Sequence, residues 1–278
     1  MKRYKSTTIG CDPEFIIVNE LGTVISPEVL FGWGLNKFRG NPYKSAYGED
    51  GCLFEIRPGY ATDTLRVVTK LRKTLKALAN NAKGLKRHTW LTGHYPYNHA
   101  LGGHIHIGGL NHNRDEVQPL ISLLDYILDS GMSHWFDDQA QKRQRILYSH
   151  AQYGKRSVYR TTPNYGMYVA TESRFQRIEY RTPGSFLISP KVTFLFLVFA
   201  KVCALIFLNG PNLSRDIIKS IKYIKRGKPL IERFIRLVRN IEYIKSQKDI
   251  QIAFSLIESI PERIKIDWNK DFKGEWRI

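Results

Sequence analysis

The chain has 278 residues, with 43 Lys and Arg against 25 Asp and Glu, so its formal net charge is +18. Apolar residues make up 42% and aromatic residues 12% of the chain, which suffices for a large core and excludes a disordered tail, a collagen-like fibre and a coiled coil. Three cysteines without a CxxC motif exclude a disulfide scaffold and a cysteine-rich zinc module, and they are typical of a cytoplasmic protein.

Hydrophobic periodicity predicts an α+β fold without repeats or linkers. The predicted strands are a hairpin over residues 7–26 and single strands over 52–57, 104–107 and 175–181. One predicted helix begins near Asp63, and others cover residues 115–130, 137–150 and 192–208. Basic amphipathic helices follow over residues 213–260. We therefore expect a catalytic domain over residues 1–209, with residues 210–278 as a basic helical extension packed on it.

The apolar run over residues 192–208 is about as short as a membrane span of roughly 17 residues can be, and Lys201 interrupts it. We predict a buried core helix and no membrane contact. The positive charge is uneven, because residues 1–62 are balanced whereas residues 63–93 carry 8 basic and 1 acidic side chains. Such helical stretches are typical of solvated faces and could also dock an acidic macromolecule.

Four of the predicted strands carry a pair of chemically active side chains two residues apart. The pairs are Asp12 and Glu14, Glu55 and Arg57, His104 and His106, and Glu179 and Arg181. Side chains alternate along a strand, so each pair shares one face, roughly 6.6–7 Å apart. If the strands share a sheet, one face therefore combines four carboxylates, two imidazoles and two guanidinium groups.

Such a face would be unstable through repulsion and desolvation unless a ligand compensated its charges. Mg²⁺ prefers oxygen ligands and leaves room for phosphates, and Mn²⁺ is an alternative. Arginines suit phosphate oxygens because of their planar, bidentate donor geometry. Together the pairs predict a site for a magnesium nucleotide and phosphoryl transfer.

These motifs are similar to those of the phage-type amidoligases, a family of carboxylate–amine ligases in the glutamine synthetase-like superfamily. The matching segments, in the order typical of the family, are Gly10-Cys-Asp-Pro-Glu-Phe15, Asp50-Gly-Cys-Leu-Phe-Glu-Ile-Arg57, Gly103-His-Ile-His-Ile-Gly108, Tyr153-Gly-Lys with Tyr159-Arg160, and Ile178-Glu-Tyr-Arg-Thr-Pro183 with Leu187-Ile-Ser-Pro190. They cover roughly residues 9–190.

The resemblance implies a glutamine synthetase-like antiparallel sheet with a catalytic face, flanked by helices. It also implies an ATP-dependent ligase with two or three divalent metals, in which ATP phosphorylates a carboxylate and an amine then displaces the phosphate to form an amide. The carboxylate and amine substrates could be amino acids, peptides or proteins. A phage origin would place the enzyme in the host cytoplasm.

The same resemblance assigns roles to individual residues. Metal ligands would be Glu14, Glu55, Glu179 and His104, with Asp12 as a ligand or an orienting group. Catalytic residues would be Glu179, Arg181 and, at a less strict position of the family pattern, Arg57. Nucleotide or acidic substrate would contact His106, Lys155, Arg156 and Arg160.

Two alternatives remain open from the sequence. His104 and His106 could belong to a zinc-dependent hydrolase with His94 or His99 as third ligand, although this leaves the arginine-containing pairs unexplained. The net charge alone favours a nucleic-acid-binding or virion-associated protein on a degenerate ligase fold, and no nucleic-acid motif supports it.

Overall fold

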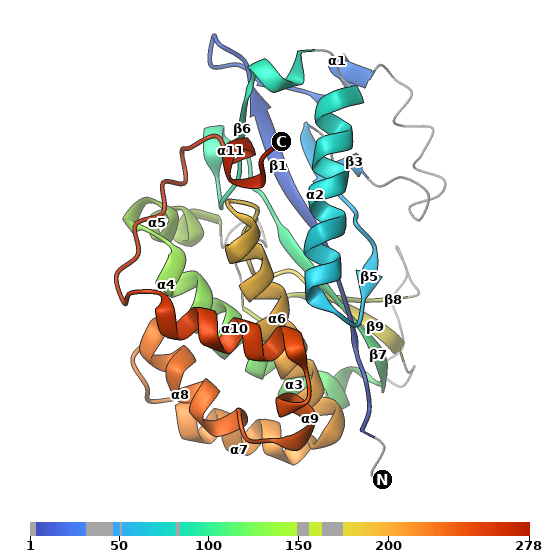
Figure 1. Ribbon diagram of the computed structural model, residues 1–278, viewed down its shortest axis with the longest axis vertical. Helices are drawn as coiled ribbons and strands as arrows, with labels where there is room; N and C mark the ends of the chain where they lie inside the picture. The colour runs from blue at the N-terminus through green and yellow to red at the C-terminus, as the bar shows by residue number, and fades with distance from the viewer. Residues whose placement is uncertain (1–3, 32–46, 51, 82–83, 149–155, 163–174) are drawn as a thin grey trace.

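The computed structural model describes residues 4–31, 47–50, 52–81, 84–148, 156–162 and 175–278. In these residues nine strands form one antiparallel sheet, with the order β3-β4-β1-β7-β9-β8 and with β2, β5 and β6 paired to β1 (Figure 1). The strands are β1 (Thr8–Val18), β2 (Val24–Ile25), β3 (Tyr47–Asp50), β4 (Leu53–Ile56), β5 (Tyr60–Ala61), β6 (Thr89–Leu91), β7 (Gly103–His112), β8 (Tyr159–Thr162) and β9 (Phe175–Tyr180).

The strands that carry the four pairs share one sheet, as the sequence analysis expects, and they are consecutive neighbours in it, β4-β1-β7-β9. β1 pairs with β4 through Glu14 opposite Glu55, and with β7 through Asp12 opposite His104. β7 in turn places His106 opposite Glu179 of β9. The register therefore brings the polar pairs of all four strands side by side.

Residues that alternate with these pairs form the apolar face of the sheet. Ile9, Phe15, Ile105, Ile178 and Tyr180 are fully buried there. Helices pack on this face, with α6 (Pro190–Asn209) against β1 and β7. The alternation thus divides the central strands into an apolar face under helices and a polar face of charged side chains.

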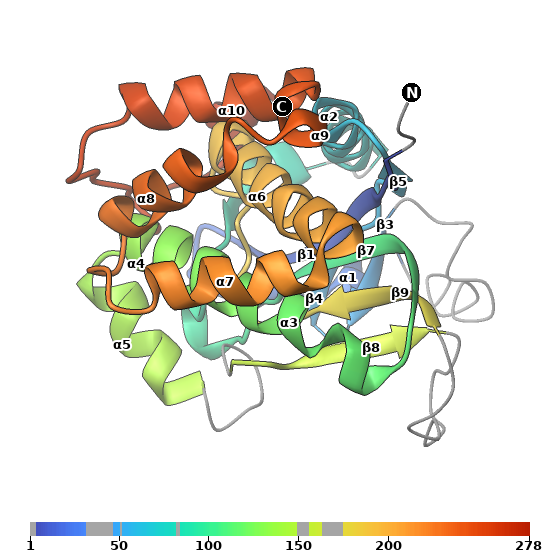
Figure 2. The same cartoon turned by 90° about the horizontal axis from the view of Figure 1, so that it is seen from below.

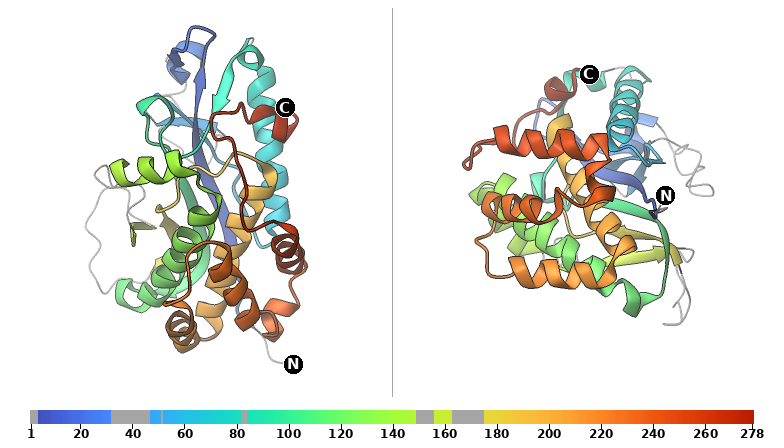
Figure 3. Two further views of the ribbon diagram at one scale, coloured as in Figure 1. Left: turned by 90° about the vertical axis from the view of Figure 1, so that its left-hand side faces the viewer. Right: turned by 60° about the horizontal axis from the view of Figure 1, so that its bottom comes forward.

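The remaining helices form the layer around α6. They are α1 (Pro27–Phe31), α2 (Thr64–Asn81), α3 (Arg114–Leu124), the π-helix η4 (Asp125–Ser133), α4 (His134–Phe136), α5 (Gln139–Tyr148), α7 (Pro211–Ile221), α8 (Lys228–Val238), α9 (Glu242–Lys245), α10 (Lys248–Ser259) and α11 (Lys273–Trp276), with short 3₁₀ turns η2 (Leu85–Arg87) and η3 (Pro96–Asn98). Figure 2 shows α6 with α7, α8 and α10 around it. In Figure 3 these C-terminal helices gather at the end of the molecule where the N-terminus lies.

Helix α6 is apolar on all sides, which is typical of a helix that is enclosed by protein or crosses a membrane. It is the one described helix that is long and apolar enough to cross a membrane, yet 94% of its most apolar stretch is buried inside the protein. The Ser189 side chain caps its first turn by accepting from Val192 N at 3.2 Å, and Pro190 follows the cap. The prediction of a core helix is confirmed.

A buried polar cluster joins three helices within this layer. Asp249 of α10 accepts hydrogen bonds from Thr64 N at 3.0 Å and Thr64 Oγ1 at 2.6 Å, at the start of α2. Lys201 Nζ of α6 lies 2.9 and 2.8 Å from the two Asp249 carboxylate oxygens. Asp249 therefore caps α2 from a distant part of the chain and neutralises Lys201, the buried cation of α6.

The C-terminal residues share the main core with the sheet. Phe272 packs edge-on against Phe15 of β1 and Trp90 of β6, and Trp276 Nε1 donates to Leu187 O at 2.6 Å. The α+β architecture, an antiparallel sheet flanked by helices, is confirmed. The domain boundary after residue 209 stays a prediction, because the core is continuous across it.

Secondary structure differs from the sequence prediction in two respects. The strands β3, β5, β6 and β8 are not predicted from the sequence, since each has only two to four residues. The helix predicted over 115–130 instead becomes a π-helix from Asp125 to Ser133. This segment buries Asp125, Asp129 and Ser130, and such widened turns frequently occur at functional positions.

Candidate functional site

Asp12 of β1 lies between the two histidines of β7. Its Oδ2 is 2.9 Å from His106 Nε2, and its Oδ1 is 3.4 Å from His104 Nδ1. The same His104 nitrogen is 3.7 Å from Glu179 Oε1 of β9. Three neighbouring strands thereby contribute one chain of alternating carboxylates and imidazoles, as the spacing of the pairs predicts.

Glu14 is the most deeply buried carboxylate of the polar face, with 1% of its surface exposed. Its Oε2 accepts a hydrogen bond from Gly102 N at 2.6 Å, while its own backbone N–H donates to Gly102 O at 2.9 Å. Gly102 also approaches His104 closely, since a Cβ there would lie 2.2 Å from His104 Nε2. Glycine is therefore required at position 102, because it leaves room for His104 beside the backbone that binds Glu14.

Two carboxylates are neutralised by the arginine of their own pair. Arg57 is hydrogen-bonded to Glu55, and Arg181 to Glu179. Glu179 and Arg181 are both buried, whereas Arg57 retains 29% side-chain exposure. Each guanidinium group thus supplies the compensating charge that a buried carboxylate needs, and both remain suited to phosphate or carboxylate oxygens.

Burial and neighbouring charges shift the pKa values of this cluster in different directions. Burial and the charge of Asp12 raise the pKa of Glu55 to about 8, although Arg57 opposes the shift. Burial alone would raise the pKa of Asp12, but His106 and His104 hold it well below its usual range. Burial lowers the pKa of both histidines, and their contacts with Asp12 outweigh it and raise them overall. Groups with such opposed shifts are typical of functional sites.

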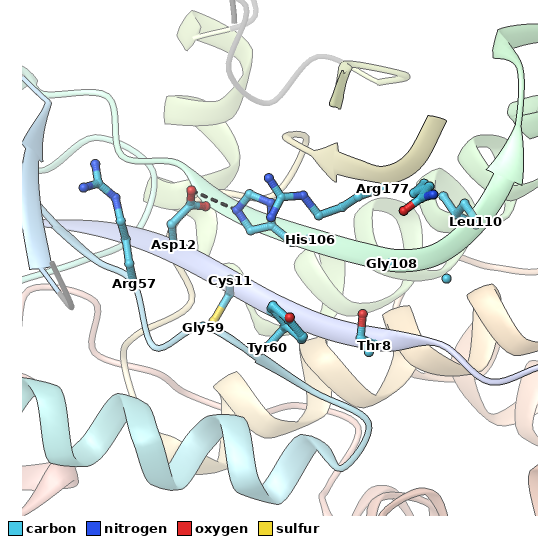
Figure 4. Close-up of a pocket in the computed structure, with 13 residues that line it drawn as sticks. Thr8, Cys11, Asp12, Arg57, Gly59, Tyr60, His106, Gly108, Leu110 and Arg177 are labelled. Carbon is cyan, nitrogen blue, oxygen red and sulfur yellow. Dashed lines mark ion pairs between the residues drawn. The ribbon is translucent and has the colours of Figure 1, made fainter. Parts of the chain in front are cut away.

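A cavity of about 730 Å³ opens beside the polar face (Figure 4). Its charged lining residues are Asp12, Arg57, His106 and Arg177, and Tyr60 and Leu110 line it as well. Arg177 was missed in the sequence, although it lies two residues before Glu179 and alternation places it on the same face. Glu14, Glu55, Glu179, His104 and Arg181 are not part of the cavity lining and lie deeper in the sheet.

The basic segment before β8 is placed differently from the prediction. Arg156 Nε lies 2.8 Å from Asp129 Oδ2, and its guanidinium also contacts Ser130, so it is held in the helix layer and not brought to the polar face. Arg160 is exposed and opposite Glu179 in the register of β8 and β9. Lys155 lies outside the described residues.

The histidines proposed as a third zinc ligand are also elsewhere. His94 Nε2 lies 3.1 Å from Asp137 Oδ2, and its backbone N–H donates to Gln141. His99 is half-buried, and its Nδ1 lies 2.6 Å from Tyr97 O.

The donor set of the polar face fits a hard divalent cation by its chemistry, because it offers carboxylate oxygens and imidazole nitrogens. Asp12 Oδ1 and His106 Nδ1 are buried and have no hydrogen-bond partner among the described residues. No three His, Cys, Asp or Glu side chains of those residues are close enough together to enclose a metal ion. To bind a cation, Glu55 and Glu179 would therefore have to break their hydrogen bonds with Arg57 and Arg181.

The antiparallel sheet carries paired carboxylates and arginines on one face, as expected for the carboxylate–amine ligases that the sequence motifs resemble. A family model described as "Phage phiEco32-like COOH.NH2 ligase-type 2" matches residues 9–278, so the chain belongs to this family of carboxylate–amine ligases. The resemblance stated from the motifs is confirmed, and the match extends through the C-terminal helices. No curated protein matches the sequence significantly.

Among solved structures, the chain is similar to a glutamine synthase homologue, at 12% identity and a TM-score of 0.41, covering 91% of this chain and 70% of the other. The complex between prokaryotic ubiquitin-like protein Pup and its ligase PafA gives 9% identity and a TM-score of 0.46, covering 91% and 63%. A bifunctional glutathione synthetase from Pasteurella multocida gives 11% identity and a TM-score of 0.46, covering 98% and 50%. The chain thus spans only half to two thirds of the last two proteins.

Proposed function

We propose that the protein is an ATP- and Mg²⁺-dependent ligase that joins a carboxylate to an amine through an acyl phosphate, giving an amide or isopeptide bond. The observation that carries the proposal is the register of β4, β1, β7 and β9, which aligns the carboxylates, imidazoles and arginines of four strands on one face. Membership of the carboxylate–amine ligase family supports this reaction class.

The divalent cation would be held by Glu14, Glu55, Glu179 and His104, with Asp12 as a further ligand or as the group that orients both histidines. ATP bound with Mg²⁺ would supply a phosphoryl group for the substrate carboxylate. The carboxylate oxygen, a poor leaving group, would thereby become part of phosphate, a good leaving group. Arg181 and Arg57, released from Glu179 and Glu55 when those bind the cation, would stabilise charge on the transferred phosphoryl group.

The cavity suits the carboxylate substrate. Arg57 and Arg177 line it and provide two guanidinium groups for an anionic group, while Tyr60 and Leu110 provide an apolar side. Asp12, whose pKa is held low by His106 and His104, stays ionised and can attract the ammonium form of the amine.

Mg·ATP binding, measured by calorimetry, and ADP release, measured with mixed amino acids and amines, test the proposal. We expect the wild-type protein to bind Mg·ATP, and Glu179→Ala to weaken binding by at least about tenfold because it removes a ligand of the cation. Glu258→Ala, which removes an exposed carboxylate paired with Arg239, is the matched control and should bind normally. Complete absence of binding at millimolar Mg·ATP would contradict the proposal, and stoichiometric tightly bound zinc would favour the hydrolase instead.

A further inference from the structure

Helix α2 carries a stripe of positive charge that has no acidic counterpart. The stripe consists of Arg66, Lys70, Lys73 and Lys76, spaced so that they follow one side of the helix. Arg66, Lys73 and Lys76 are exposed and Lys70 is half-buried, while Val67, Leu71 and Leu75 on the opposite side are fully buried. The helix contains no acidic residue at all.

Some basic residues of the C-terminal helices are paired with carboxylates, for example Lys219 with Asp216, Lys228 with Glu232 and Arg239 with Glu258. Others, such as Lys222, Arg226 and Arg236, form no ion pair within the described residues. Within the described part of the chain, no carboxylate forms an ion pair with any cation of the α2 stripe. The stripe is thus a concentrated, uncompensated field, which is typical of a surface that attracts a polyanion.

The stripe leads to the cavity of the candidate site. Lys70 Nζ donates to Tyr60 O at 3.3 Å, and Tyr60, which is 65% exposed, lines that cavity with Arg57 and Arg177. Helix α2 packs against β5, the strand that contains Tyr60. Positive charge therefore continues from the outer side of α2, past Tyr60, to the two arginines of the cavity.

The dimensions of the stripe fit an extended polypeptide. Ten residues separate Arg66 from Lys76, which corresponds to about 15 Å along a helix and to roughly five residues of extended chain. An acidic polypeptide also carries side-chain carboxylates, the group that the proposed reaction activates, whereas a nucleic acid carries phosphates that cannot form an amide. The charge and the reaction together favour a polypeptide.

We infer that an acidic polypeptide substrate docks along the α2 stripe and places a side-chain carboxylate in the cavity between Arg57 and Arg177. The inference rests on the proposed function, which it extends by naming the class of the carboxylate substrate. The stripe is the recruiting surface, and the cavity receives the reacting group.

A fluorescein-labelled deca-glutamate peptide, followed by fluorescence anisotropy without nucleotide, tests the docking surface. The variant combines Arg66→Glu, Lys73→Glu and Lys76→Glu, leaving Lys70 in place because it supports Tyr60. The control combines Lys222→Glu, Arg226→Glu and Arg236→Glu, which makes the same change in net charge at exposed positions on and around α8. Circular dichroism melting shows whether both variants are folded.

We expect the α2 variant to weaken peptide binding by about tenfold or more at low ionic strength, the control to change it less than about twofold, and wild-type binding to weaken as salt screens the charges. Equal effects of the two variants would overturn the inference. So would tighter binding of duplex DNA than of the peptide, with the α2 variant affecting both alike. Because this assay contains no nucleotide, failure of peptide binding is distinguishable from failure of Mg·ATP binding.

Discussion

Two clusters of buried charge lie on opposite sides of the sheet and are built differently. In the helix layer, Asp249 accepts hydrogen bonds from Thr64 and Lys201 through both carboxylate oxygens. On the polar face, Asp12 has a carboxylate oxygen, and His106 a ring nitrogen, without a hydrogen-bond partner among the described residues. The two unpartnered atoms, Asp12 Oδ1 and His106 Nδ1, are themselves buried, so exposure to solvent does not explain the difference.

This difference in hydrogen-bond satisfaction distinguishes buried charges that maintain the fold from those that are available to a ligand. Burial alone would raise the pKa of Asp249, but Lys201 and Thr64 lower it overall, so its charged form is the one that the fold stabilises. Glu55 of the polar face has its pKa raised to about 8, so there the fold resists the charged form. A buried polar group that the protein leaves unsatisfied requires an explanation, and a ligand is the simplest one.

The largest effect is expected from Asp249→Ala. This change leaves the Lys201 ammonium buried without its partner and removes the cap from α2, so we expect a loss of about 3–5 kcal/mol of unfolding free energy in urea. The double variant Lys201→Met with Asp249→Leu removes both charges and should recover most of that loss. If Asp249→Ala cost less than about 1 kcal/mol, the cluster would not be the structural element that the comparison assumes.

A smaller effect is expected from Gly103→Ala at the start of β7, beside the polar cluster. A Cβ at Gly103 would lie 2.2 Å from the backbone oxygen of Gly184, which has little freedom to move. We expect a loss of about 1–3 kcal/mol, measured by urea unfolding. Gly274→Ala is the control, since no atom lies within 4 Å of a Cβ at that position, and equal stabilities of the two variants would show that the strand can shift to make room.

The third prediction concerns the pH dependence that Glu55 contributes. Unfolded Glu55 ionises near its ordinary pKa of 4.5, whereas folded Glu55 keeps its proton up to about 8, so the folded state binds more protons between these values. Stability should therefore fall as pH rises through this window, by at most about 1.4 kcal/mol per pH unit. Glu55→Gln should flatten this fall in urea unfolding curves collected from pH 5 to 8. Superimposable pH profiles would place Glu55 outside the coupled cluster.

Much of the site could be predicted from local spacing. Alternation along a strand fixes which residues share a face, so the pairs of Asp12 with Glu14 and of His104 with His106 were sufficient to predict the polar face. The same rule also places Arg177 on this face, because it lies two residues before Glu179. The order of the strands is not visible in the spacing, and the family resemblance implies only that the sheet is antiparallel.

Other features depend on contacts between residues far apart in the chain. The segment that contains Arg156 has a composition typical of a phosphate site, yet its guanidinium pairs with Asp129, which lies on a π-helix that periodicity cannot distinguish from an ordinary helix. Likewise, spacing shows that Glu55 and Arg57 share a face but not whether the arginine meets its neighbour or a substrate. Such partner choices are decided by tertiary packing, which a single sequence does not encode locally.

The position of β1 as the strand to which β2, β4, β5, β6 and β7 all pair has a consequence for folding during synthesis. β1 leaves the ribosome before all five of these partners, the last of which ends at His112. β9, which completes the polar face through β7, follows β1 by about 160 residues, or about 10–30 s at typical rates. Until β9 has been made, the edge of β7 that faces β9 lacks this partner. We therefore expect nascent chains shorter than about 180 residues to depend on chaperones that shield an unpaired strand.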